Sequence, residues 1–172
     1  TRYLYDSTNK SSISSNMIFS AASGSNGLLW LGTAGEGLNK FDPASGIFTS
    51  YKRNLLDTNS ISGNFIRSLY IDNSGNIWAG TMQRGLDMLD VSTGKFHRFI
   101  IPGNNSAENS GSVFSIIPHY GESNKLWISS DAGLFSLDKS TGTLTGHDIY
   151  KDELTRNKGI VAACMDSSGV LW

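Results

Sequence analysis

The sequence is poor in cysteine, in charged residues and in long apolar runs, and each shortage excludes a class of protein. Cys164 is the single cysteine in 172 residues, so neither an internal disulfide framework nor a cysteine metal cage can form. We expect its side chain to be buried in a strand. Charged residues make up 17% of the chain and the net charge is −1, which argues against a nucleic-acid groove or an anionic membrane surface as partner. No apolar run approaches the length of a membrane-spanning helix.

Turn-forming residues are abundant instead. The chain has 19 Gly, 26 Ser and 14 Asn, so 59 of its 172 positions favour turns. This is too much turn chemistry for a helical bundle, and the regularly spaced apolar residues are too many for a disordered chain. No segment shows convincing helical periodicity. The composition therefore predicts an all-β fold.

An internal repeat is the main signal in the sequence. All four tryptophans lie in the same short phrase, typified by Gly75-Asn-Ile-Trp78-Ala-Gly-Thr81, and their spacings are 48, 49 and 45 residues. They are Trp30, Trp78, Trp127 and Trp172. Each of the first three is followed by a Gly-Leu pair, whose glycines are Gly37, Gly85 and Gly133, and then by Asp42, Asp90 and Asp138. We interpret these ten residues as structural elements of the repeat.

Each repeat is expected to form four short antiparallel strands. In the second repeat we predict strands over 66–71, 77–81, 86–89 and 95–100, because these segments are rich in Ile, Leu, Phe, Trp and Thr and are bounded by Gly, Asn, Asp and Ser. Asp72 and Gly75 suit the tight turn between the first two strands. In the first repeat that aspartate is replaced by Gly24.

A repeat of this length with four strands is typical of one β-propeller blade. A single four-stranded sheet cannot bury both faces, so we expect neighbouring blades to pack on it, with the repeated tryptophan wedged between them. We predict one partial β-propeller over 1–172: the tail of a preceding blade at 1–16, full blades at 17–64, 65–112 and 113–159, and the start of a further blade at 160–172.

The repeat resembles the two-component regulator propeller repeat. The second repeat fits that pattern throughout, at Asp72, Gly75, Trp78, Gly80, Thr81, Gly85, Leu86, Asp90, Gly94 and Phe96. The third repeat departs from it, because Asn124 replaces a glycine and Ser129-Ser130 replaces Gly-Thr.

This resemblance implies a periplasmic sensor region of a large hybrid histidine kinase/response regulator of the Bacteroidetes type. Such regions contain seven-bladed propellers, followed by a membrane helix and a cytoplasmic kinase, so contact with the membrane is expected only through other parts of the parent protein. The resemblance implies a non-catalytic module that recognises glycan-derived ligands, such as an oligosaccharide, and regulates phosphorelay in a dimer.

The parity of the strands indicates where a ligand would bind. The loops between the second and third strands, and the long connections between blades, share one end of the propeller, and their sequences differ from repeat to repeat. Our ligand-binding candidates are Arg67 on an inner strand, Arg84, Glu36 and Asp131 at loop tips, and Tyr120 as a stacking residue. An arginine in such a place can hold a carboxylate or sulfate of an acidic sugar.

Searches for catalytic patterns return little. His97, His119 and His147 are scattered, and no Gly-x-Ser-x-Gly nucleophile motif occurs. We therefore predict no catalytic residue, metal or cofactor. Two alternatives to the sensor remain open: a protein-interaction scaffold, and a propeller lyase or glycosidase.

Three blades and two remnants do not close a seven-membered ring. We therefore expect an isolated copy to self-associate, for example as a homodimer, through its open blade edges.

Overall fold

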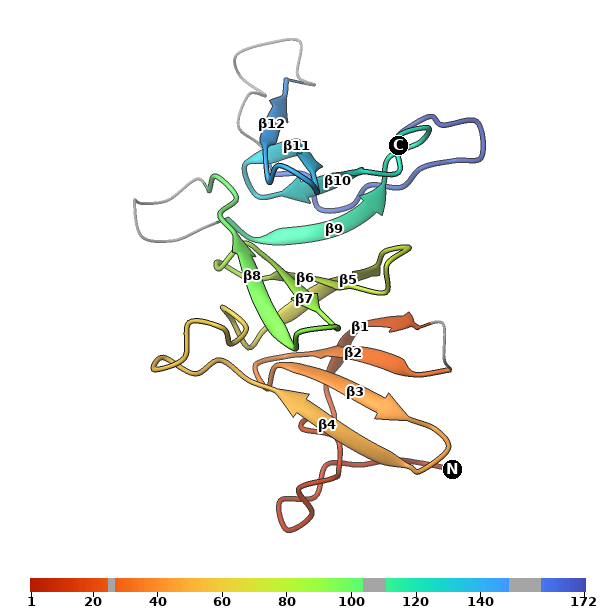
Figure 1. Ribbon diagram of the computed structural model, residues 1–172, viewed down its shortest axis with the longest axis vertical. Helices are drawn as coiled ribbons and strands as arrows, with labels where there is room; N and C mark the ends of the chain where they lie inside the picture. The colour runs from red at the N-terminus through yellow and green to blue at the C-terminus, as the bar shows by residue number, and fades with distance from the viewer. Residues whose placement is uncertain (25–26, 104–110, 149–158) are drawn as a thin grey trace.

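The computed structural model describes residues 1–24, 27–103, 111–148 and 159–172. The chain forms three four-stranded antiparallel sheets in sequence order, stacked along the long axis of the molecule (Figure 1). Among the described residues there is no helix. It follows that none of them forms a helix that could cross a membrane. The fold is a fragment of a β-propeller.

The strand bounds repeat closely from sheet to sheet. The first sheet holds β1 (Ile18–Ser23), β2 (Leu29–Thr33), β3 (Leu38–Asp42) and β4 (Ile47–Tyr51). The second holds β5 (Ile66–Ile71), β6 (Ile77–Thr81), β7 (Leu86–Asp90) and β8 (Lys95–Phe99). The third holds β9 (Val113–Pro118), β10 (Lys125–Ser130), β11 (Gly133–Asp138) and β12 (Leu144–His147). The strands predicted for the second repeat are confirmed to within one residue.

The first strands of the sheets lie next to one another. β1 packs beside β5, and β5 beside β9, so these three strands form an inner edge, while β4, β8 and β12 lie at the opposite edge of each sheet. This is the radial arrangement of propeller blades.

The tryptophans fill the space between sheets. Trp30 is 4% exposed and belongs to one core with Ile77, Leu89 and Phe96 of the second sheet. Trp78 is 1% exposed and packs in the same way against the third sheet. Trp127 is only half-buried and contacts the rings of His119 and His147, with centroid distances of 5.1 and 4.7 Å.

The glycine two residues after each of the first two tryptophans is required by space. A Cβ on Gly80 would lie 2.2 Å from Ser68 Oγ and 2.7 Å from Val113 Cγ1 of the next sheet. A Cβ on Gly32 would lie similarly close to Ser20 and to Ile66 of the next sheet. In the third sheet Ser129 occupies this position, and its Oγ lies 2.6 Å from Ser115 Oγ. Glycine therefore allows neighbouring sheets to approach closely at the inner edge.

The repeated aspartates cap turns. Backbone N–H groups of Ala44, Ser92 and Ser140 donate to Asp42, Asp90 and Asp138 over 2.8–2.9 Å. Hydrogen bonds from Ser92 and Thr93 hold the pKa of Asp90 at about 2. The glycines where the third strands begin have positive φ angles: 82° at Gly37, 81° at Gly85 and 121° at Gly133.

Two expectations at the C-terminal end were wrong. Cys164 is exposed, and residues 160–165 form no named strand. The only described β-type pairing of this segment is next to its turn. It consists of the Met165–Leu171 bridge and the backbone hydrogen bonds between Cys164 and Trp172. Because so few residues pair, no ladder covers the thiol.

The segment before the first sheet covers an outer face of that sheet. Tyr3 contacts the rings of Phe41 and Phe48, at 4.7 and 5.6 Å between centroids, and Ile13 completes the same small core. The 52–64 connection packs on the second sheet as the N-terminal segment packs on the first. Phe96 N donates to Asn59 O, and Phe48 N donates in the same way to Ser11 O. One face of the first sheet is therefore partly covered by the chain's own N-terminal segment.

Candidate functional site

One end of the three sheets carries all the variable connections. The β2–β3, β6–β7 and β10–β11 loops lie at this end because their strands are antiparallel, and the β4–β5 and β8–β9 connections return to it. We call this end the rim. The other end holds the tight hairpins within each sheet.

Hydrogen bonds hold the rim loops in place. The hydroxyl groups of Thr33, Thr81 and Ser130 donate to the carbonyls of Gly37, Gly85 and Gly133 over 2.7–3.1 Å. Bonds also join neighbouring sheets, because Gly37 N donates to Asn64 O at 2.7 Å and Gly85 N to Gly111 O at 3.0 Å. The rim is therefore a fixed platform for the side chains that differ between repeats.

Arg67 lies on the inner edge near the rim. Its guanidinium carbon is 5.0 Å from the centroid of the Phe114 ring on β9, which is a cation–π distance. Phe19 and Phe65 form a second aromatic pair near this edge, with centroids 4.9 Å apart. Arg67 has no ion-pair partner among the described residues.

The three loop-tip candidates lie on the rim, one on each sheet, in different environments. Arg84 is half-buried, and its side chain lies next to the position of Gly63. Glu36 is exposed and forms an ion pair with Lys52, at 2.5 Å between Nζ and Oε2. The carboxylate of Asp131 accepts the Ser112 N–H at 3.1 Å, which ties it to the local backbone.

Tyr120 lies at the other end of the sheets. It belongs to the β9–β10 hairpin, is 59% exposed, and packs close to Gly169. The structure therefore brings Arg67, Arg84, Glu36 and Asp131 to the rim end and separates Tyr120 from them.

The structure also shows a rim pocket that we did not foresee. It has a volume of about 300 Å³ and lies between the 52–64 connection and β8, with Arg53, Arg98, Asp57 and Ser62 among its lining residues. Neither arginine has an ion-pair partner among the described residues. The sequence held one sign of this pocket: both arginines are specific to this repeat unit. The equivalent positions of the preceding unit are occupied by Tyr5 and Ser50.

A buried carboxylate, that of Asp87, accepts hydrogen bonds from Ser62, one of the residues that line this pocket. Asp87 is 0% exposed, and its Oδ2 accepts from Ser62 N at 3.1 Å and Ser62 Oγ at 2.6 Å. Its Oδ1 has no hydrogen-bond partner in the part of the chain that the structure describes. Burial raises the pKa of Asp87 to about 6, although the bonds from Ser62 and the charge of Arg98 oppose the rise.

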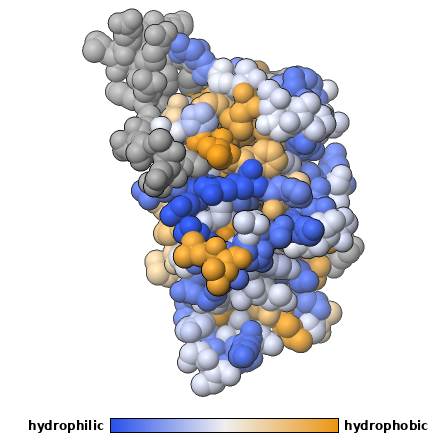
Figure 2. Space-filling model, turned by 60° about the vertical axis from the view of Figure 1, so that its left-hand side comes forward, coloured by the Kyte–Doolittle hydropathy of each residue, from blue (hydrophilic) through white to orange (hydrophobic). Residues whose placement is uncertain are grey.

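The 52–64 connection also carries two neighbouring leucines that are strongly exposed. Leu55 is 78% exposed and Leu56 is 96% exposed. Figure 2, in which the side of the molecule carrying this connection is turned forward, shows a compact hydrophobic patch bordered by hydrophilic surface. Such a patch on a polar surface is a common mark of contact with another molecule.

Comparisons with known proteins support the resemblance found in the sequence. Residues 60–83 match the family model described as Two component regulator propeller. A comparison with curated proteins gives no match. The match lies in the second repeat, which fits the two-component regulator propeller pattern throughout, and it confirms the resemblance that the motifs indicated.

Solved structures of two extracellular domains show the same fold. The chain is similar to the extracellular domain of the hybrid two component system BT3049 from B. thetaiotaomicron, at 25% identity and a TM-score of 0.77, over 99% of this chain and 24% of that one. For the extracellular domain of the one component system BT4673 from the same organism, the identity is 25% and the TM-score 0.74, over 99% of this chain and 21% of that one. The chain therefore spans less than a quarter of either domain.

A more distant likeness shows the propeller fold alone. The WD40 repeats of RRP9 match with a TM-score of 0.58 at 10% identity, over 84% of this chain and 40% of that one.

Proposed function

We propose that this chain, which carries the two-component regulator propeller repeat, is a non-catalytic segment of a periplasmic sensor region and that its rim recognises an acidic, glycan-derived ligand. Ligand binding would regulate phosphorelay in a parent hybrid histidine kinase. The likeness to extracellular domains of two-component systems supports the sensor role and a location outside the cytoplasm.

The observation that carries the ligand class is the distribution of arginine. Arg53, Arg67, Arg84 and Arg98 all lie at the rim end of the second sheet or on the connection leading into it. None has an ion-pair partner among the described residues. Planar guanidinium groups bind carboxylates and sulfates through two parallel hydrogen bonds. The Phe114 ring beneath Arg67 restricts the orientation of that guanidinium.

Binding of a glycan panel tests this proposal. Acidic oligosaccharides bearing uronate or sulfate groups should raise the unfolding temperature, because a ligand of the native state stabilises it by mass action. Arg67→Ala and Arg84→Ala should each weaken binding about tenfold. Arg2→Ala removes an exposed arginine from the tail and serves as the control. Binding of neutral and acidic oligosaccharides with equal strength, unaffected by the rim variants, would exclude an acidic ligand.

A protein-interaction scaffold is the second candidate function, and the exposed Leu55 and Leu56 favour it. If the rim binds a protein, Leu56→Ser should reduce that binding while leaving oligosaccharide binding intact.

Self-association through blade edges also stays a proposal. Light scattering that shows only a monomer at micromolar concentration would contradict it.

A further inference from the structure

The two described contacts between sheets differ at one buried polar group. Between the second and third sheets, Trp78 Nε1 donates to Asp72 Oδ2 at 2.9 Å. Lys139 Nζ of the third sheet lies 4.0 Å from the same oxygen. The following hairpin repeats the indole bond, since Trp172 Nε1 donates to Asp166 Oδ2 at 2.9 Å. Trp78 and Trp172 therefore share a carboxylate on the indole N–H, whereas Gly24 and Gly121 stand at the equivalent positions before Trp30 and Trp127.

The contact between the first and second sheets lacks this carboxylate. Gly24 stands at the position of Asp72, and Val91 at the position of Lys139. A Cβ placed on Gly24 would lie 3.9 Å from Trp30 Nε1, with no contact shorter than 3.5 Å. No described residue accepts a hydrogen bond from the Trp30 indole. The indole donor is present, and among the described residues nothing comes closer than 3.5 Å to the position where the acceptor side chain would begin.

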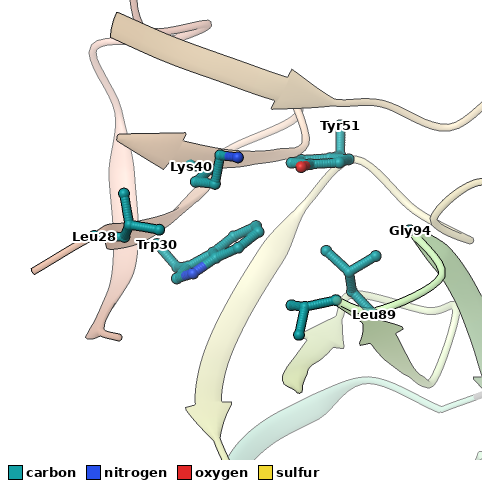
Figure 3. A pocket seen from close by; sticks show the side chains of 7 residues that line it. Leu28, Trp30, Lys40, Tyr51, Leu89 and Gly94 are labelled. Carbon is teal, nitrogen blue, oxygen red and sulfur yellow. The ribbon is translucent and has the colours of Figure 1, made fainter. Parts of the chain in front are cut away.

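A pocket adjoins this space. Leu28 and Trp30, the two residues nearest to the missing side chain, both line a cavity of about 160 Å³ between the first two sheets. Lys40 and Tyr51 line it as well, and Figure 3 shows the Lys40 amine and the Tyr51 hydroxyl pointing toward one another on one side of the Trp30 ring. The rings of Trp30 and Tyr51 are stacked, with centroids 5.7 Å apart.

The lysine of the pocket stands at a position where the second sheet has none. Lys40 takes the position that Met88 occupies in the second sheet. The first contact thus lacks both Asp72 and Lys139 but has a lysine on its own strand β3. The result is a cationic, aromatic pocket with a free indole donor and no carboxylate among its lining residues.

We propose that this pocket binds a small organic carboxylate. The ligand carboxylate takes the place of the missing aspartate and accepts the Trp30 Nε1–H. The body of the ligand lies on Leu28 and Leu89, and Lys40 supplies the positive charge. The pocket lies toward the hairpin end of the sheets, away from the rim, so this inference does not rest on the rim function proposed above.

The indole N–H resonances of the ¹⁵N-labelled full chain test the proposal. Titration with sodium acetate should shift the Trp30 resonance in a saturable way, whereas Trp78 and Trp172, already bonded to Asp72 and Asp166, should stay in place. Sodium chloride at equal ionic strength controls for screening, and sodium sulfate distinguishes a carboxylate site from a general anion site.

Variants make the assignment specific. Gly24→Asp supplies the carboxylate within the chain, so the Trp30 resonance should lie near the acetate-saturated position without ligand and should no longer respond. Lys40→Met, which installs the residue of the second sheet, should weaken acetate binding about tenfold. Lys10→Met removes an exposed lysine in the tail and should have no effect. An unmoved Trp30 resonance, an equal response to chloride or sulfate, or an unaltered response in Gly24→Asp would each overturn the proposal.

Discussion

Replacing the buried Asp87 by asparagine should stabilise the protein above pH 6. Asp87 is fully buried, and one of its oxygens has no partner among the described residues. The first sheet shows the neutral alternative at the equivalent position. There Asn39 accepts from Ser14 N at 3.0 Å, and its amide donates to Ser14 Oγ at 2.7 Å. An asparagine at position 87 can make the same two bonds with Ser62.

The magnitude follows from the pKa of Asp87. Burial raises this pKa from 3.8 to about 6, so the folded state disfavours the ionised carboxylate. The loss of folding stability caused by ionising Asp87 is absent below pH 3.8, grows as the pH rises toward 6, and is constant above pH 6. A rise from 3.8 to about 6 corresponds to about 3 kcal/mol, which is the expected gain of Asp87→Asn in the free energy of unfolding at pH 7.5.

Urea unfolding of both proteins between pH 3.5 and 8 measures this gain. The difference between them should be close to zero at the acid end and reach a plateau above pH 7. Asn39→Asp is the matched control, and it should destabilise the protein at pH 7.5, at least as strongly, because Ser50 and not an arginine lies opposite residue 39. A difference independent of pH, or a less stable Asp87→Asn at pH 7.5, would refute the reasoning.

Three further substitutions test the contacts within and between sheets. Gly80→Ala places a methyl group 2.2 Å from Ser68 Oγ and 2.7 Å from Val113. Thermal unfolding should show a loss of about 1–3 kcal/mol in the free energy of unfolding. Unchanged stability would mean that the sheets can separate at no cost. Asp72→Ala leaves the Trp78 indole and the N–H groups of Ser74 and Asn76 without their acceptor. It should lower the free energy of unfolding by about 2 kcal/mol and alter tryptophan fluorescence. Asp42→Ala, in an exposed turn, should lower it by less. Thr81→Val removes the hydroxyl that donates to Gly85 O at 2.8 Å and should cost about 1 kcal/mol in chemical unfolding, with Thr49→Val on the exposed face of β4 as a neutral control.

The sequence by itself determined the fold and the end of the sheets at which the variable loops lie. The tryptophan spacing defines the repeat, and Asp and Gly turns bound four short strands, because local turn chemistry and strand propensity act within a few residues. Strand parity then put Arg67, Arg84, Glu36 and Asp131 at one end. The same parity put Tyr120 at the opposite end, a consequence that the structure makes plain.

Only the tertiary structure decided which side chains meet. Arg53 and Arg98 are 45 residues apart in the sequence and line one pocket because the 52–64 connection docks against the second sheet. The replacement of an aspartate by Gly24 is visible in the sequence, but the open space beside the Trp30 indole depends on how closely the two sheets approach. Long-range packing sets these distances, and it is not encoded in the local pattern of any one repeat.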